Sequence, residues 1–116
     1  MNLLKNIGIG IDIVEVKRFM KKPYASHKSF YKKIFSISEI NYCLKFKEPY
    51  KHFAGKFAIK EAVKKAMADD VALLDIQTGH ADSKPTVSIK GKAHSFLVSI
   101  SHEYDTAVAV VISEKA

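Results

Sequence analysis

Residues 8–19 read GIGIDIVEVKRF. The first part of this stretch belongs to an apolar run over residues 3–14, in which aliphatic residues alternate as is typical of a β-strand. Because side chains alternate across a strand, Asp12 shares a face with Gly8 and Gly10, opposite the isoleucines. The two glycines carry no side chain, so we expect room for a ligand beside the carboxylate. An unpaired carboxylate in an aliphatic strand is costly, so Asp12 requires a cation, a metal ion or strong hydrogen-bond donors nearby.

A second segment, FAGKFAIKEAVKKA at residues 53–66, has the periodicity of an amphipathic helix. Pro49 marks its start, since proline is favoured in the first helical turn, and we expect the helix to reach about residue 68. Lys56, Lys60 and Lys64 recur at four-residue spacing. This spacing places like charges close together unless an anion bridges them.

Shorter elements surround this helix. Residues 14–20 favour a short helix, and a capping box formed by Ser36 and Glu39 predicts another over residues 37–46. Strands are expected after Asp70, over residues 73–78, 86–90, 96–101 and 106–113, with turns at 79–85, 91 and 102–105. This order predicts an α+β fold, an antiparallel sheet packed against helices, in one domain of residues 1–116.

The composition is that of a folded protein, with 47% hydrophobic and 27% charged residues. No apolar run reaches the ~18 residues of a membrane helix and the N-terminus has no cleavage-site pattern, so we expect a cytoplasmic protein. The single cysteine, Cys43, cannot form an intramolecular disulfide, which suits a reducing compartment. Its helical setting favours a half-buried packing role.

Positive charge is concentrated in the first part of the chain. Through residue 65 there are 15 Lys or Arg against 5 Asp or Glu, whereas the remainder has 4 against 7. We expect an anionic partner for the basic part, although charge alone does not identify it. A nucleic-acid-binding module would explain the charge but not Asp12, because a groove for phosphates gains nothing from a carboxylate.

Asp12 on the strand and Glu61 on the helix are suited to bind a hard divalent cation together. Mg²⁺ takes one or two protein carboxylates and fills its other positions with water and phosphate oxygens. Lysines on the same helix would hold the remaining phosphate charge. Alternatively, Glu61 pairs with Lys65 in a common helix-surface contact that needs no function. The spacing leaves both interpretations open.

Three strings in this order, GIGIDIVEVKRF, FAGKFAIKEAVKKA and VSISHEYDTAVAVVI, resemble the holo-acyl-carrier-protein synthase family, the short class of 4′-phosphopantetheinyl transferases. The resemblance covers nearly the whole chain. Its most specific elements are GID followed six positions on by Arg18, the FAxKxxxKEAxxKA helix and SISH before the last strand. It implies Mg²⁺-dependent transfer of 4′-phosphopantetheine from coenzyme A to a serine of apo acyl carrier protein, in fatty acid biosynthesis.

The resemblance also implies roles for individual residues. Asp12 and Glu61 would hold Mg²⁺ against the pyrophosphate of coenzyme A, and either a metal-held water or Glu61 would take the serine proton. Lys60 is expected to be catalytic with them. Contacts to coenzyme A are expected from Lys56, Lys60, Lys65, Lys84, Pro85, Ser101 and His102.

The family also implies protein partners. Arg18, Lys21 and Lys22 correspond to the helix that meets the acidic recognition helix of the carrier protein, although such a cluster is also typical of a solvated face. The family assembles as homotrimers with active sites at subunit interfaces, and a small valine-rich sheet would benefit from a partner surface. We therefore expect a homotrimer, with no nucleic-acid or membrane partner.

The chain departs from the family pattern at several positions: Lys56 replaces a frequent Arg, and further departures lie at Asp69, Asp70, Ser83 and Glu103. They affect the expected contacts to coenzyme A rather than the reaction class. A non-catalytic relative is a further alternative, against which the retention of Asp12 and Glu61 argues. His102 alone would also fit a simple turn donor. The other histidines lack metal-ligand spacing and are expected at the surface without a role: His27, His52, His80 and His94.

Overall fold

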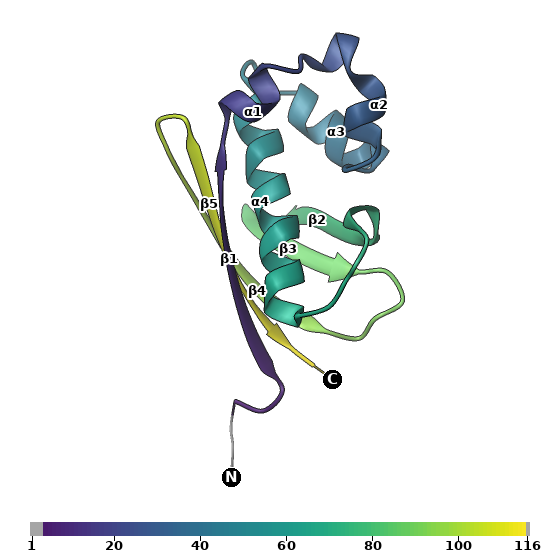
Figure 1. Ribbon diagram of the computed structural model, residues 1–116, viewed down its shortest axis with the longest axis vertical. Helices are drawn as coiled ribbons and strands as arrows, with labels where there is room; N and C mark the ends of the chain where they lie inside the picture. The colour runs from purple at the N-terminus through teal and green to yellow at the C-terminus, as the bar shows by residue number, and fades with distance from the viewer. Residues whose placement is uncertain (1–3, 116) are drawn as a thin grey trace.

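The computed structural model describes residues 4–115, so Leu3 of the first expected strand lies outside the described residues. Within that range the chain forms an α+β fold, as predicted (Figure 1). The helices are α1 (Lys17–Met20), α2 (Lys28–Lys32), α3 (Ile37–Leu44) and α4 (Pro49–Met67), with 3₁₀ turns η1 (Tyr24–Ser26) and η2 (Leu73–Asp75). The strands are β1 (Ile7–Glu15), β2 (Ile76–Ala81), β3 (Lys84–Ile89), β4 (Ser95–Glu103) and β5 (Thr106–Glu114).

The strands form two antiparallel sheets. The larger has the order β1-β5-β4, and the smaller is the hairpin β2-β3. Helix α4 lies against β1 and β5, while α3 and the β2-β3 hairpin lie on its other side (Figure 1). The predicted β4-β5 hairpin is confirmed, and β1 completes the larger sheet by placing Asp12 opposite Ala109. Helix α4 is therefore the element from which both sides of the molecule are built.

Gly8 and Gly10 bring the backbone of β1 against that of α4. A Cβ atom on Gly8 would overlap the carbonyl oxygen of Ala66, and one on Gly10 would overlap that of Ala62. Only a residue without a side chain fits at either position. The prediction that these glycines leave room for a ligand is therefore wrong, because the helix itself occupies the space.

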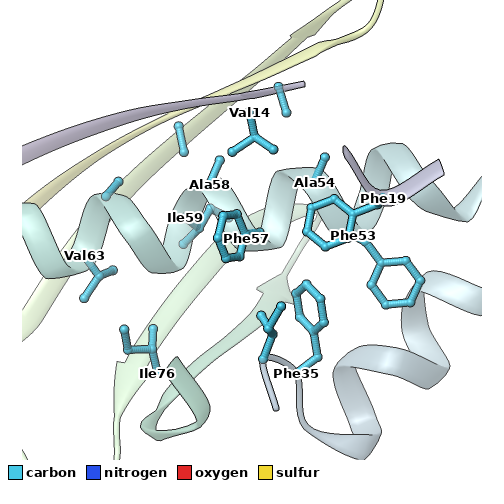
Figure 2. Packing of buried hydrophobic residues seen from close by; sticks show 14 of the residues in the cluster. Val14, Phe19, Phe35, Phe53, Ala54, Phe57, Ala58, Ile59, Val63 and Ile76 are labelled. Carbon is cyan, nitrogen blue, oxygen red and sulfur yellow. The ribbon is translucent and has the colours of Figure 1, made fainter. Parts of the chain in front are cut away.

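The core surrounds α4. Figure 2 shows Phe19, Phe35, Phe53 and Phe57 gathered near the helices, with Ala54 and Ala58 pointing toward the larger sheet. The ring centroid of Phe19 lies about 6 Å from those of its aromatic neighbours, for example 5.6 Å from that of Phe57. Within the described residues no helix is long and apolar enough to cross a membrane.

Cys43 lies deeper in this core than we predicted. It is fully buried rather than half-buried, and burial raises the pKa of its thiol to about 12. A thiol that stays protonated at neutral pH is a poor nucleophile. Cys43 is therefore a packing residue.

The element boundaries differ from the sequence predictions mainly at turns. The expected turn over residues 79–85 is a two-residue turn at Asp82 and Ser83, whose φ angles are 51° and 68°. Gly79 and Pro85 belong to the paired strands. Proline is tolerated there because both strands of a two-stranded sheet are edge strands, in which a missing backbone N–H need not break a hydrogen bond. Helix α1 begins at Lys17 rather than residue 14, because β1 continues to Glu15.

Other local predictions agree with the structure. Ser36 and Glu39 form the expected capping box at the start of α3. Pro49 begins α4, and Ala68 ends it in the left-handed region with φ of 53°. The strand expected over residues 96–101 is longer than predicted. It is β4, which runs to Glu103 and leaves a turn at Tyr104 and Asp105.

Candidate functional site

Asp12 is held by a lysine from the neighbouring helix. Lys65 Nζ on α4 lies 3.1 Å from Asp12 Oδ1 and also donates to the carbonyl oxygen of Ile11 at 2.9 Å. The side chain of Asp12 is 17% exposed and that of Lys65 is 56% exposed. The prediction that Asp12 requires a positive partner is confirmed. Lys65 pairs with Asp12, whereas the alternative was a pair with Glu61.

The contact between β1 and α4 also places Asp12 relative to Glu61. Gly8 faces Ala66 and Gly10 faces Ala62, so two residues of strand correspond to four residues of helix. The two steps agree in length, at about 6.7 Å for the strand and about 6 Å for the helix. The next step sets Asp12 against the helical turn at residues 58–62, which carries Glu61.

Glu61 is a partly buried carboxylate without a protein partner. No residue in the described part of the chain forms a hydrogen bond or an ion pair with it. An unpaired carboxylate on the helical turn that faces Asp12 gives, together with Asp12, a donor set suited to a hard cation. Over residues 4–115 there is no cluster of three or more metal-ligating side chains, so the chain offers two carboxylates and leaves other positions to water or phosphate. This donor set fits Mg²⁺.

A pocket lies on another side of α4. Its volume is about 70 Å³, below the roughly 300 Å³ at which typical ligand pockets begin, so it suits one group of a larger ligand. Helix α4, the β2-β3 hairpin and β4 contribute its walls. The lining residues are Tyr42, His52, Gly55, Lys56, Ile59, Gly79, His80, Pro85, Ile100 and His102.

Lys56 gives this pocket its positive charge. It is only 5% exposed, and its Nζ donates to Thr78 Oγ1 at 3.0 Å. The ammonium also lies 4.6 Å from the ring centroid of Tyr42, in a cation–π contact. Burial lowers the pKa of Lys56, and no carboxylate of residues 4–115 forms a salt bridge with it. A desolvated ammonium in this position would be stabilised by an anion.

His102 reaches the same pocket from β4. Its Nε2 lies 3.0 Å from the carbonyl oxygen of Lys51, and since a carbonyl only accepts, Nε2 carries the proton. A Cβ atom at Gly55 would lie 3.1 Å from His102 Nε2 and 2.7 Å from Ile100 Cδ1. The absence of a side chain at Gly55 is what lets the imidazole approach the helix.

Two histidines to which we assigned no role also line the pocket. His52 stacks on Phe46 with 3.7 Å between ring centroids, and His80 stacks on Tyr42 at 4.8 Å. Burial lowers the pKa of both imidazoles, so they are neutral at pH 7. The spacing of His52, four residues before Lys56 on one helix, was the signal that could have indicated its place.

Lys60 reaches neither site. It is fully buried, and its Nζ donates to Glu39 Oε1 at 2.8 Å and to the carbonyl oxygens of Ile34 at 2.8 Å and Leu73 at 3.0 Å. An ammonium has three donors, so none remains for a phosphate. The predictions that Lys60 is catalytic and binds the phosphates of coenzyme A are therefore wrong. Its role is to join α4 to α3 and to the segment before β2.

Lys84 and Ser101 lie outside the pocket. Lys84 is exposed at the start of β3, next to Pro85, which does line the pocket. Ser101 is exposed on β4, and strand alternation turns it to the face opposite His102. The structure thus brings together Lys56, Pro85 and His102 of the residues expected to contact coenzyme A.

The basic residues of the first helix are exposed together. Arg18 lies on α1, and Lys21 and Lys22 directly follow it. The guanidinium of Arg18 lies 4.8 Å from the ring centroid of Phe57, and Lys22 Nζ lies 4.5 Å from that of Phe30. These contacts hold the charged groups over aromatic rings while leaving them accessible.

The carboxylate site and the pocket face different sides of α4. Lys56 and Glu61 are five residues apart, and a rotation of about 100° per residue separates their directions by about 140°. A single chain therefore presents two carboxylates on one side of its central helix and a pocket lined by a lysine on another. This combination of negative and positive groups is suited to a cation and a phosphorylated ligand.

Comparison with known proteins identifies the family of the chain. The model of the 4′-phosphopantetheinyl transferase superfamily matches residues 8–112. A holo-[acyl-carrier-protein] synthase of Thermodesulfovibrio yellowstonii is 38% identical over 108 residues, which cover 90% of this chain and 96% of the relative. The chain belongs to the holo-[acyl-carrier-protein] synthase family of this superfamily.

Solved structures show the same fold. The holo-(acyl-carrier-protein) synthase of Bacillus anthracis, in complex with CoA (3′,5′-ADP), has a TM-score of 0.80 at 34% identity, covering 94% of this chain and 96% of that one. The Helicobacter pylori enzyme in complex with coenzyme A has a TM-score of 0.78 at 32% identity, covering 91% of this chain and 99% of that one. The α+β fold expected from the resemblance is confirmed.

Proposed function

We propose that this protein transfers 4′-phosphopantetheine from coenzyme A to a serine of apo acyl carrier protein in fatty acid biosynthesis, acting as a single domain. The pyrophosphate bond of coenzyme A breaks, and adenosine 3′,5′-bisphosphate is released with holo acyl carrier protein. The observation that carries the proposal is the Asp12 carboxylate, held by Lys65 against the turn of α4 that carries Glu61, a carboxylate with no hydrogen-bond partner among residues 4–115. Relatives named for this reaction share the fold, and two of them have been solved with coenzyme A or its 3′,5′-ADP part.

Asp12 and Glu61 would hold Mg²⁺. Bound there, the cation would reduce the negative charge that opposes attack on the pyrophosphate and stabilise the leaving phosphate. Lys65 contributes a fixed positive charge at the same place, because its ammonium is already bonded to Asp12 and to the backbone of Ile11. The proton of the attacking serine passes to Glu61, whose carboxylate has no competing protein donor, or to a water beside it.

The pocket around Lys56 would hold a phosphate of the nucleotide part. Lys56 supplies an ammonium without a carboxylate partner, and His102 and Pro85 form adjacent walls. Lys84, next to Pro85 on the hairpin, would contact the parts of coenzyme A that extend beyond this small hollow. Ser101, on the opposite face of β4, would contact coenzyme A bound by a neighbouring subunit. The ligand thus requires positive groups from α4 and from the hairpin together.

A homotrimer would join the two sites. The outer face of the larger sheet carries exposed isoleucines on β1, with Ile9 at 68% and Ile13 at 69% exposure, beside Leu97 of β4 at 71%. Val108, Val110 and Ile112 of β5 lie opposite the β1 isoleucines on this face. Covering such an apolar face is a strong reason to associate, and a subunit interface would bring the carboxylates of one chain toward the pocket of its neighbour.

The basic group Arg18, Lys21 and Lys22 would bind the carrier protein. Acidic helices are attracted to such a surface, and the stacked position of Arg18 on Phe57 orders its guanidinium in advance. This group follows the strand that carries Asp12, so a docked carrier protein would bring its serine toward the carboxylate site.

The test is intact-mass spectrometry of an apo acyl carrier protein incubated with this protein and coenzyme A. We expect the carrier mass to increase by one phosphopantetheine when Mg²⁺ is present and to stay unchanged with a chelator. An increase that is independent of the cation would overturn the Mg²⁺ assignment. No increase with several carrier proteins and a folded enzyme would overturn the transfer function and favour a non-catalytic relative.

A further inference from the structure

Thr78 connects the pocket lysine to the buried Glu39–Lys60 pair. Its Oγ1 lies 3.0 Å from Lys56 Nζ and 2.6 Å from Glu39 Oε2. Three elements meet at this one hydroxyl, because α3 carries Glu39, α4 carries Lys56 and β2 carries Thr78. Thr78 is itself buried, so the network is shielded from competing water.

The Glu39 carboxylate accepts hydrogen bonds at both oxygens. Oε1 accepts from Lys60 Nζ and from the backbone nitrogen of Ser36, each at 2.8 Å. Oε2 accepts from the backbone nitrogen of Thr78 at 2.9 Å as well as from its hydroxyl. Burial alone would raise the pKa of Glu39, but these hydrogen bonds outweigh burial and lower the pKa below its ordinary value. The carboxylate is therefore ionised and its hydrogen-bonding positions are filled.

The ionised state of Glu39 fixes the direction of the next bond. An ionised carboxylate cannot donate, so Thr78 gives its only hydroxyl proton to Glu39. The Thr78 oxygen then presents only lone pairs to Lys56, whose ammonium donates to it. One of the three Lys56 donors is thereby used, and the Tyr42 ring lies against the same ammonium. Two N–H groups remain for a ligand.

We propose that Thr78, held by Glu39, is a positioning residue that directs the remaining donors of Lys56 toward an anionic group bound in the pocket. The proposal rests on the proposed function, in which this anion is a phosphate of coenzyme A. A free lysine side chain loses rotamer freedom when it binds a ligand, whereas one already ordered by a hydrogen bond loses less. Thr78 acts through Lys56 and touches no part of coenzyme A.

The test is a double-mutant cycle on coenzyme A affinity, measured by titration calorimetry with the full chain. Thr78→Val removes the hydroxyl but keeps the side-chain shape and the backbone N–H bond to Glu39. Thr78→Ser retains the hydroxyl and is the matched control. We expect Thr78→Val to weaken coenzyme A binding about tenfold, and Thr78→Ser to stay within about twofold of wild type. In transfer assays the loss should appear in KM for coenzyme A, with kcat changed by less than about twofold.

The Lys56→Met background separates positioning from packing. When Lys56 is absent, Thr78→Val should change affinity by less than about twofold further. An equal loss in both backgrounds, or wild-type affinity in Thr78→Val, would overturn the proposal. Thermal unfolding identifies variants that fail to fold, and Thr78→Ala replaces Thr78→Val in that case.

The same experiments distinguish this proposal from the proposed function. In one outcome, wild-type protein binds coenzyme A more tightly than Thr78→Val by the expected factor and still leaves apo acyl carrier protein unmodified. That result would overturn the transfer function and support positioning. A wild-type protein that transfers phosphopantetheine, together with an unaffected Thr78→Val variant, would overturn positioning alone.

Discussion

Helix α4 carries two lysines that pair with carboxylates from other elements, in opposite settings. Lys60 and Glu39 are 2.8 Å apart and essentially inaccessible, with every donor of the ammonium used. Lys65 and Asp12 are 3.1 Å apart, and their pair is partly open to solvent. The comparison shows that pairing alone does not indicate function. The buried pair stabilises the contacts of three elements, whereas the open pair leaves a carboxylate able to bind a ligand.

The two pairs should respond to mutation in opposite ways. Removing one partner of a buried pair leaves an uncompensated charge in the core, which is strongly destabilising. Removing Asp12 from the partly exposed pair costs little stability, because water solvates the Lys65 ammonium that remains. Stability should therefore depend on Lys60, and activity on Asp12.

The largest effect is expected for Lys60→Met. It removes the charge that compensates Glu39 and three hydrogen bonds, so we expect the free energy of unfolding to fall by about 3–5 kcal/mol. Urea denaturation measures the change. Lys64→Met, one turn along the same helix, is the matched control and should change stability by less than about 1 kcal/mol. Equal effects of the two substitutions would contradict the structural role of Lys60.

Asp12→Asn should produce the next largest effect, on activity. An amide keeps the shape but removes the charge that holds the cation, so we expect the transfer rate to fall by about 10²–10³-fold. The intact-mass assay measures the rate, and stability should stay within about 1 kcal/mol of wild type. Asp105→Asn, which breaks the exposed pair with Lys17, is the control with unchanged activity. A fully active Asp12→Asn variant would remove Asp12 from the proposed site.

Acid should weaken the buried pair specifically. Because the folded pKa of Glu39 lies below its unfolded value of 4.5, its contribution to stability is fully present above that value. The contribution is lost as the pH falls through the folded pKa. Denaturation curves between pH 7 and pH 3 should show this loss in wild type. In Glu39→Gln the loss should be smaller, and an identical pH dependence in that variant would assign the acid sensitivity to other groups.

The smallest effect is expected from Lys65→Met on stability. The Lys65 side chain is 56% exposed, but Asp12, which would lose its partner, is only 17% exposed, so the free energy of unfolding should fall by about 1 kcal/mol, well below the loss for Lys60→Met. Urea denaturation of Lys65→Met and Lys60→Met under the same conditions compares their free energies of unfolding directly. A loss as large as that of Lys60→Met would show that the open pair also supports the fold.

The contrast between these lysines marks the limit of what the sequence predicts. Lys56 and Lys60 are the same residue type one turn apart, and both were expected to contact coenzyme A. Their difference arises from Thr78 and Glu39, which other elements bring to them. Local periodicity locates α4 and its start at Pro49, but it carries no information about which distant group meets each side chain.

The glycines of β1 illustrate the same limit. The alternation of residues 7–13 correctly predicts a strand with Asp12 on the glycine face, since alternation is a property of the strand alone. What fills the space beside Gly8 and Gly10 depends on α4, more than 50 residues later in the chain. Asp12 was still identified correctly as a residue in need of a positive partner, because that need follows from its own charge.

The pairing of β1 with β5 affects when the site can form during synthesis. Ribosomes release a chain from its N-terminus, so Asp12 emerges early, whereas its neighbour in the sheet, Ala109, emerges close to the end of the described chain. The strand that carries Asp12 must wait, without a sheet partner, until β5 has been made. A nascent chain that stops before Thr106 can contain every helix and both carboxylates, yet β1 then has no strand to pair with. The sheet that supports the carboxylate site on the side away from α4 is therefore complete only after the last strand has been made.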